Sequence, residues 1–126
     1  ERVGAGVEAF ARRALAEPTR AYALLAEPVD PAVEAERLAF RRGYRDVLVA
    51  TIEHGIASGE LSRHDTETFG AALVGAIGEA LVGPLSPAAA ANGARRSHEA
   101  LIASLVQFCI SSLPREESHD GHRAHA

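Results

Sequence analysis

The sequence contains no lysine, no methionine, no tryptophan and a single cysteine, and aromatic residues make up only 5% of its 126 residues. With so few aromatic side chains, the core must be built mainly from alanine, leucine, valine and isoleucine. Cys109 has no partner for a disulfide within the chain, which favours a reducing compartment such as the cytoplasm. The 13 basic residues, all arginine, are scattered and are outnumbered by 17 acidic residues, which argues against nucleic-acid binding by this chain alone.

The sequence also lacks an uninterrupted apolar run of the about 20 residues that a membrane-spanning helix needs. Residues 69–85 come closest and read FGAALVGAIGEALVGPL, but this run is shorter, contains Glu79 and ends at Pro84, so we expect no contact with a membrane. We expect no secretion, because the chain does not open with the positively charged and then apolar residues of a signal peptide. Because the chain begins with Glu1 rather than methionine, we expect an N-terminal portion of the protein to precede it.

Proline, glycine and capping residues divide the chain into helices. Asp30 is an N-cap followed by Pro31 at the first helical position, Gly59 suits the left-handed residue that ends a helix, and Asp65 is a second N-cap. We expect helices at about 3–16, 18–26, 31–58, 65–83 and 94–113. Since no alternating strand pattern occurs, the fold class is all-α, a bundle of about five helices in one domain spanning 1–113. Residues 114–126 are polar and predict a disordered tail.

The last two expected helices are apolar on more than one side. In residues 69–85 one face carries Phe69 and Leu73 and another carries Val74 and Leu81, while residues 100–113 contain no charge at all. A helix packed only on its own domain needs one such face. We therefore predict a homodimer in which these two helices pair with their symmetry mates as a four-helix bundle. The alternative is that both are central helices buried within one chain. The predicted dimer-interface residues are Gly70, Val74, Gly78, Leu81, Val82, Leu101, Ile102, Leu105 and Phe108.

Glycine is costly inside a helix, at about 1 kcal/mol relative to alanine, and residues 69–85 contain four. Gly70, Gly75 and Gly78 therefore indicate either a close approach between helices or space for a bound molecule.

Between Val3 and Leu113, motifs that are individually of low specificity follow one another in a particular order. They are the helix RAYALLA at 20–26, the turn EPVDP at 27–31, the stretch RLAFRRGY at 37–44 of the long helix, the turn GIASGEL at 55–61 and the Gly- and Ala-rich helix at 69–85. In this order they resemble the C-terminal regulatory domain of the TetR family of bacterial transcription regulators. The resemblance implies a dimer formed by the last two helices, a ligand cavity in each domain, and operator DNA bound only by an N-terminal helix-turn-helix, which this chain lacks.

A cavity of that kind would lie among inward-facing side chains of neighbouring helices, and ligand sites are typically apolar with a few placed polar groups. His54 is a further polar candidate, and Glu79 is either a ligand contact, a polar pair across the dimer or a rim residue. We expect a small apolar or amphipathic effector. The predicted ligand-binding residues are Phe10, Tyr22, Phe40, Tyr44, Leu48, Thr51, Phe69, Leu73 and Ile77.

Catalytic and metal-binding signatures are missing. The sequence has no Gly-x-Ser-x-Gly elbow, phosphate loop or dinucleotide-binding glycine pattern, and it has a single Glu-x-x-His spacing, Glu116 with His119 in the polar tail, where a di-iron helical bundle needs two on helices. His119, His122 and His125 are spaced for a transition metal, but they lie in the polar tail. Cys109 lies among apolar residues and is expected to be an inert buried thiol. We predict no catalytic residue, no metal and no cofactor. Two alternatives to a ligand sensor stay open: an interaction module with a solid core, and a small helical enzyme with titratable groups converging on a cavity.

Overall fold

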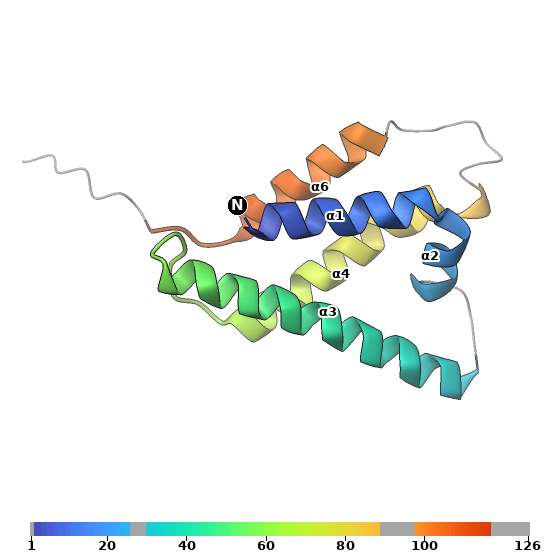
Figure 1. Cartoon of the computed structure of the whole chain (residues 1–126), viewed down its shortest axis with the longest axis horizontal. Helices are drawn as coiled ribbons and strands as arrows, with labels where there is room; N and C mark the ends of the chain where they lie inside the picture. The colour runs from blue at the N-terminus through green and yellow to red at the C-terminus, as the bar shows by residue number, and fades with distance from the viewer. Residues whose placement is uncertain (1, 26–29, 89–97, 117–126) are drawn as a thin grey trace, which may run out of the picture.

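The computed structural model describes residues 2–25, 30–88 and 98–116. Within these ranges the chain forms helices and no strand, which confirms the all-α prediction (Figure 1). The expected start of the last helix at 94 and the tail histidines lie outside the described residues. The helices are α1 (Arg2–Ala16), α2 (Pro18–Leu25), α3 (Pro31–Ala57), α4 (Thr66–Leu85) and α6 (His98–Ser112).

The two ends of α3 are set by the residues that the sequence indicates. The Asp30 carboxylate accepts hydrogen bonds from the backbone N–H groups of Ala32 at 2.9 Å and Val33 at 3.1 Å, and Pro31 occupies the first turn. At the other end Gly59 adopts a φ of 82°, where side chains are disfavoured, and its N–H donates to the Ile56 carbonyl. Both predicted boundaries are therefore confirmed to within a residue.

Helix α4 runs two residues beyond the expected end at Gly83. Pro84 lies inside it, in the last turn, where the missing N–H removes only one hydrogen bond. The helix then ends at Ser86, whose backbone N–H and hydroxyl both donate to the Gly83 carbonyl, at 3.1 Å and 2.8 Å. The helix therefore ends two residues later than the sequence predicts, because a proline in the last turn does not stop it.

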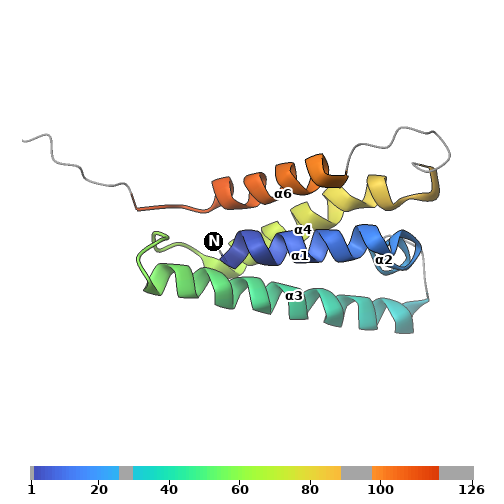
Figure 2. The ribbon, with the colours of Figure 1, turned by 45° about the horizontal axis from the view of Figure 1, so that its top comes forward.

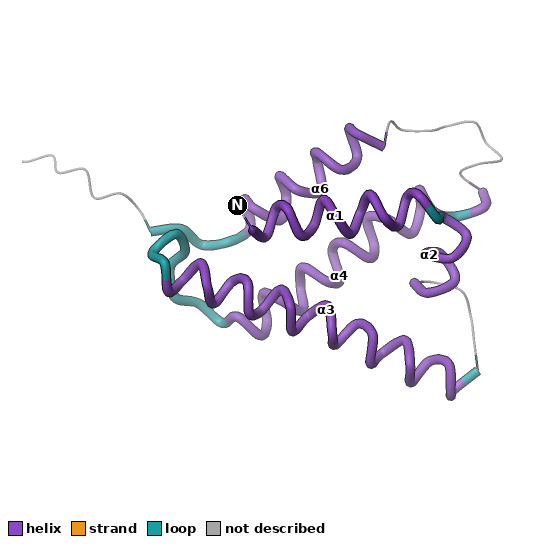
Figure 3. Tube along the Cα trace, viewed as in Figure 1, coloured by secondary structure: helices purple, strands orange, loops and turns teal. Residues whose placement is uncertain are grey.

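Helix α1 lies in the middle of the molecule, with α6 on one side and α3 on the other (Figures 1 and 2). Its most extensive packing is against α6, whereas α3 packs most extensively against α4. Helix α4 passes across α1 and also contacts α2. At one end of the bundle the loop after α3 lies beside the segment after α6, where the Ser62 N–H donates to the Pro114 carbonyl at 3.0 Å (Figure 3).

The core is aliphatic, as the scarcity of aromatic residues predicts. None of the phenylalanines or tyrosines is buried; Phe10, Tyr22 and Phe69 pack only at its edge. Close packing of such small side chains over several helices supplies the hydrophobic stabilisation. The buried core residues are Val3, Val7, Ala11, Ala14, Leu15, Leu48, Ile52, Leu61, Leu73, Ile77, Leu81, Leu85, Leu101, Ile102, Leu105, Cys109 and Leu113.

The chain buries by itself much of the apolar surface that the sequence assigned to a partner. On α4 a single buried stripe combines members of both predicted faces: Gly70, Leu73, Ile77, Leu81 and Leu85. Helix α6 buries Leu101, Ile102, Leu105 and Cys109 in the same core. The two helices make little contact with each other, and each packs more extensively against α1. The alternative of helices buried within one chain therefore accounts for Leu81, Leu101, Ile102 and Leu105.

Among the described residues, α4 is the one helix long and apolar enough to cross a membrane. Its buried stripe packs against α1, α2 and α3 of its own chain. A core helix of a water-soluble protein has the same length and composition.

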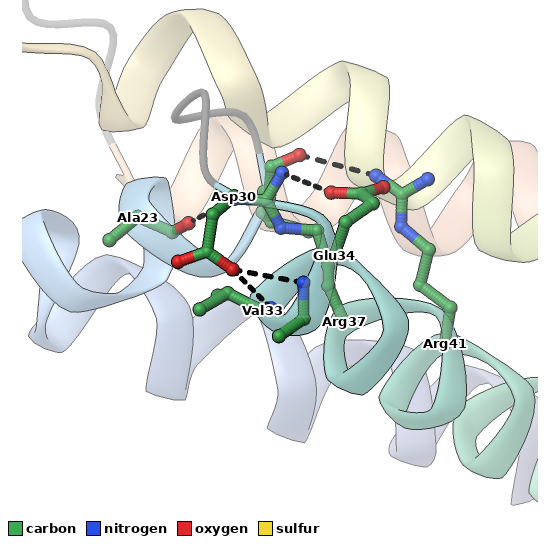
Figure 4. A network of polar contacts seen from close by, with 8 residues as sticks. Ala23, Asp30, Val33, Glu34, Arg37 and Arg41 are labelled. Carbon is green, nitrogen blue, oxygen red and sulfur yellow. Dashed lines mark hydrogen bonds and ion pairs between the residues drawn. The ribbon is translucent and has the colours of Figure 1, made fainter.

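Arginine side chains join the helices at the surface. Arg37 donates to the Ala23 carbonyl at 2.7 Å and pairs with Glu34 at 3.1 Å, while Arg41 donates to the Leu25 carbonyl at 3.2 Å (Figure 4). These bonds satisfy carbonyl groups that the end of a helix leaves without partners, and they fasten α2 to the first half of α3.

We expect Gly70→Ala to destabilise the protein. A Cβ at Gly70 would lie 2.6 Å from Cγ2 of Val49, a buried β-branched residue that cannot rotate away within a helix. Overpacking costs about 1–3 kcal/mol and outweighs the gain from replacing glycine. The matched control is Gly43→Ala, whose Cβ meets nothing within 4 Å and which should gain about 1 kcal/mol. Urea unfolding of both variants measures the difference; equal stabilisation would refute the close approach.

We expect the Asp65 cap to make stability depend on pH. The Thr68 hydroxyl and the Thr68 backbone N–H donate to the carboxylate and hold the pKa of Asp65 below its usual range. A carboxylate with a lowered folded pKa stabilises the protein above its unfolded pKa, and this contribution is lost as pH falls through the folded pKa. Asp65→Asn keeps a cap that does not titrate. The variant should be less stable than the parent at neutral pH, and the difference should vanish in acid. A difference in urea midpoints that is constant with pH would contradict this.

Candidate ligand-binding cleft

The first half of α3 is poorly covered by the rest of the chain. Toward its N-terminus α3 diverges from α1 and α4, at the side of the bundle where α2 lies (Figure 1). Large apolar side chains remain exposed there and just beyond it on α3, with 44% of Phe40 and 65% of Val47 accessible. Singly exposed apolar residues are ordinary, but a series of them on one helix marks a surface that something covers. The exposed series on α3 is Val33, Leu38, Phe40, Tyr44 and Val47.

A cleft of about 800 Å³ lies between this half of α3 and helices α1, α2 and α4. Its deepest walls are buried core side chains: Val3 and Val7 of α1, Leu48 of α3 and Ile77 of α4. A smaller cleft of about 250 Å³ shares Phe10, Phe40 and Tyr44 with it. The volume and the apolar lining are those of small-molecule sites in proteins.

Three aromatic rings stand at the border of the two clefts. The ring of Tyr44 lies 4.7 Å from that of Phe10 on α1 and 4.8 Å from that of Phe40, and both pairs are edge-on. Edge-to-face pairs of this kind are favourable and fix the orientation of the rings. The cluster therefore joins α1 to α3 across the cleft and offers it flat apolar surface.

Glycines keep the cleft open on the side of α4. A Cβ at Gly75 would meet nothing within 4 Å, and one at Gly78 would meet only the Leu25 side chain at 3.9 Å. Gly6 of α1 also lines the cleft and has equally open space. The predicted role of Gly75 and Gly78 as space for a bound molecule is consistent with this geometry, whereas Gly70 makes a close helix contact with Val49.

Most of the predicted ligand-binding residues meet in this cleft. Phe10, Phe40, Tyr44, Leu48, Thr51 and Ile77 line it. The Thr51 hydroxyl donates to the Val47 carbonyl at 2.8 Å, so a ligand would meet its oxygen as an acceptor. Glu79, for which the sequence left three roles open, also lines the cleft and is exposed.

Four predicted contacts lie elsewhere. Leu73 is a core residue with 3% exposure, and Tyr22 packs at the edge of the core. The Phe69 ring packs against the His64 ring at 4.4 Å, and His54 is exposed outside the cleft. Helical periodicity identifies inward faces, but it does not separate a core position from a cavity wall on the same face.

The cleft is also lined by arginines, which the sequence did not predict as ligand-binding residues. Arg2 of α1 and Arg41, Arg42 and Arg45 of α3 all border the cavity. The spacing along α3 could have identified them. Leu38, Arg42 and Arg45 are three or four residues apart, so they share a side of the helix. From the sequence alone, arginines at this spacing on a helix indicate a solvent-facing side.

Several predicted dimer residues also border the cleft. Val74, Gly78 and Val82 line it from α4. Phe108 is different, because 55% of it is exposed on α6, away from the cleft. It is the one predicted interface residue with a large apolar side chain exposed to solvent.

The cleft contains no set of groups suited to hold a metal. In the part of the chain that the structure describes, no three His, Cys, Asp or Glu residues come together. Cys109 is fully buried in the core, and burial raises the pKa of its thiol. Its predicted character as a buried thiol is confirmed.

No protein-family model matches this chain, no curated protein matches it, and no solved structure matches it. The resemblance to the TetR family therefore stays a prediction that rests on the order of the sequence motifs.

We expect the thiol of Cys109 to react slowly with a disulfide reagent in the folded protein and fast in denaturant. Burial blocks access, and the raised pKa lowers the thiolate fraction at neutral pH. The absorbance change on adding 5,5′-dithiobis(2-nitrobenzoate) gives both rates. Fast reaction in native buffer would contradict the burial of Cys109.

Proposed function

We propose that this chain is the effector-sensing and dimerisation domain of a TetR-like bacterial transcription regulator that acts in the cytoplasm. A small molecule bound between α1, α2, α3 and α4 modulates operator binding by an N-terminal helix-turn-helix of the full protein. The chain itself is not an enzyme.

The observation that carries the proposal is the apolar cleft of about 800 Å³ bordered by Phe10, Phe40 and Tyr44. Its size suits a drug-sized or lipid-like molecule, and the rings supply much of the contact area. The cleft favours a ligand sensor over an interaction module with a solid core. Among the residues that the structure describes, the titratable lining is arginines, Tyr44 and Glu79, without the histidine or cysteine that most acid–base and nucleophilic mechanisms use, which supports a binding role.

A ligand in this cleft would act on α1 and α3 together. Helix α1 packs against α3 and α4 as well as α6, and the Phe10–Tyr44 contact is one link across the cavity. A molecule that binds one spacing of α1 and α3 better than another shifts the population toward that spacing. In a dimer this changes the separation of the two DNA-binding domains. A coupling of about 1–3 kcal/mol alters operator affinity about 5–150-fold.

The outer face of α6 is the surface that best suits the proposed dimer. Phe108 is exposed at its centre, and the exposed residues around it, Ala103, Ser104, Gln107 and Ser111, are small or uncharged. Interfaces are depleted in charge at their core and enriched in aromatic residues. Pairing of this face between two copies requires no charged group to be desolvated.

The ligand site is tested with a neutral fluorescent probe, N-phenyl-1-naphthylamine. We expect the probe to bind and Gly75→Leu to abolish binding, because its side chain extends into the open space of the cleft. Gly43→Leu is the matched control: it also has open space but does not line the cleft, so binding should persist. Equal binding by both variants, each shown folded by circular dichroism, would refute the site.

The dimer is tested by sedimentation equilibrium. We expect the parent chain to be a dimer and Phe108→Glu to be a folded monomer, because a charge buried in an apolar contact costs several kcal/mol, about a thousandfold or more in dimer affinity. Leu105→Glu is a less useful variant, since Leu105 is buried within its own chain and the change would unfold it. A monomeric parent chain, or a dimer that Phe108→Glu leaves intact, would refute this face.

A further inference from the structure

We infer that the effector is an amphipathic anion: a flexible apolar chain or ring system ending in one carboxylate or phosphate group. This inference rests on the proposed function, because it concerns the chemistry of the molecule that fills the same cleft. It follows from the charges that surround an otherwise apolar cavity.

Among the described residues, the cleft is lined by four arginines and one glutamate. Arg2 lies at the start of α1, and Arg41, Arg42 and Arg45 lie on the wall formed by α3. Within 2–25, 30–88 and 98–116, Glu79 is the one carboxylate in the lining. The whole chain has the opposite balance, with a net charge of −4. The positive lining is therefore local to the cleft, and an apolar cavity with a cationic border focuses an attractive field on an anion.

The four arginines differ in the hydrogen bonds and ion pairs that they already make within the chain. Arg41 donates to the Leu25 carbonyl, and Arg45 lies 3.8 Å from an Asp46 oxygen and 4.0 Å from a Glu67 oxygen. Arg2 and Arg42 are exposed and make no hydrogen bond or ion pair with residues 2–25, 30–88 or 98–116. As far as the described part of the chain is concerned, two guanidinium groups at the cleft thus have all their donors available for a ligand.

Guanidinium groups bind carboxylate and phosphate in a planar, two-pronged geometry and stay charged at any physiological pH. The aliphatic walls around Val7, Leu48 and Ile77 hold the apolar part of the same molecule. A cationic or neutral ligand would leave the arginines without a partner. The combination of apolar walls with a cationic border therefore selects an anion with an apolar body.

The test is a series of probes that share one twelve-carbon chain and differ only in the head group: dodecanoate, dodecyl phosphate, dodecan-1-ol and dodecyltrimethylammonium. Binding to the parent chain and to Arg2→Gln/Arg42→Gln is measured by isothermal titration calorimetry below micelle-forming concentrations. Neither arginine bonds to the described part of the chain, so the double variant should fold normally. Arg63→Gln, an exposed arginine outside the cleft, controls for loss of charge in general.

We expect both anions to bind at least about tenfold more tightly than the alcohol, as a charged hydrogen bond allows, and the ammonium probe to bind least. The double variant should remove that advantage without changing the affinity for the alcohol, whereas Arg63→Gln should change neither. Added salt should weaken the anions more than the alcohol. The tighter of the two anions identifies the source of the head group, a free acid or a phosphate ester.

Two other outcomes would overturn the inference, and they differ in what they say about the cleft. If dodecan-1-ol or the ammonium probe binds as tightly as dodecanoate, and Gly75→Leu abolishes that binding, the inference about charge is overturned while the cleft remains a ligand site. If none of the four probes binds the folded chain, the inference is overturned together with the site on which it rests.

Discussion

The length of α3 is the constraint on which the rest of the structure depends. It has 27 residues, whereas α1 has 15 and α4 has 20. Its second half is fixed to α4 by the contact of Gly70 with Val49, and its first half is held to α2 through Arg37 and Arg41. Between these two attachments α1 reaches α3 through the Phe10–Tyr44 contact, while Val47 of α3 stays exposed. The cleft is the space that remains.

Small side chains shape both the core and the cleft, and what faces them decides their role. Gly70 and Gly75 lie on the same helix, five residues apart. A side chain at Gly70 would collide with Val49, while one at Gly75 would extend into empty space. The first glycine brings two helices together and the second leaves room beside them. An aliphatic core allows this, since the aromatic rings are displaced to its edge, where Phe10 and Tyr44 border the cavity.

The cleft could be predicted in part, and the failures have a common physical cause. Phe40 and Tyr44 were predicted because they lie on the apolar side of an amphipathic helix. Leu73 lies on an equally apolar side of α4, yet it packs into the core. Periodicity reports which side of a helix avoids water, and core and cavity wall avoid it alike. Arg42 was not predicted because a charged side of a helix looks the same whether it faces bulk solvent or borders a cleft.

The sequence by itself determined that the chain is helical, where α3 begins and ends, where α4 begins, and the aliphatic character of the core. Asp30, Gly59 and Asp65 act through hydrogen bonds and dihedral angles within a few residues, so their effect is encoded locally. The tertiary structure alone decided that α4 and α6 both pack against α1, that one chain buries Leu81 and Leu105, and that arginines of α1 and α3 line one cavity. These outcomes depend on how whole helices compete for the same buried surface, which no local pattern specifies.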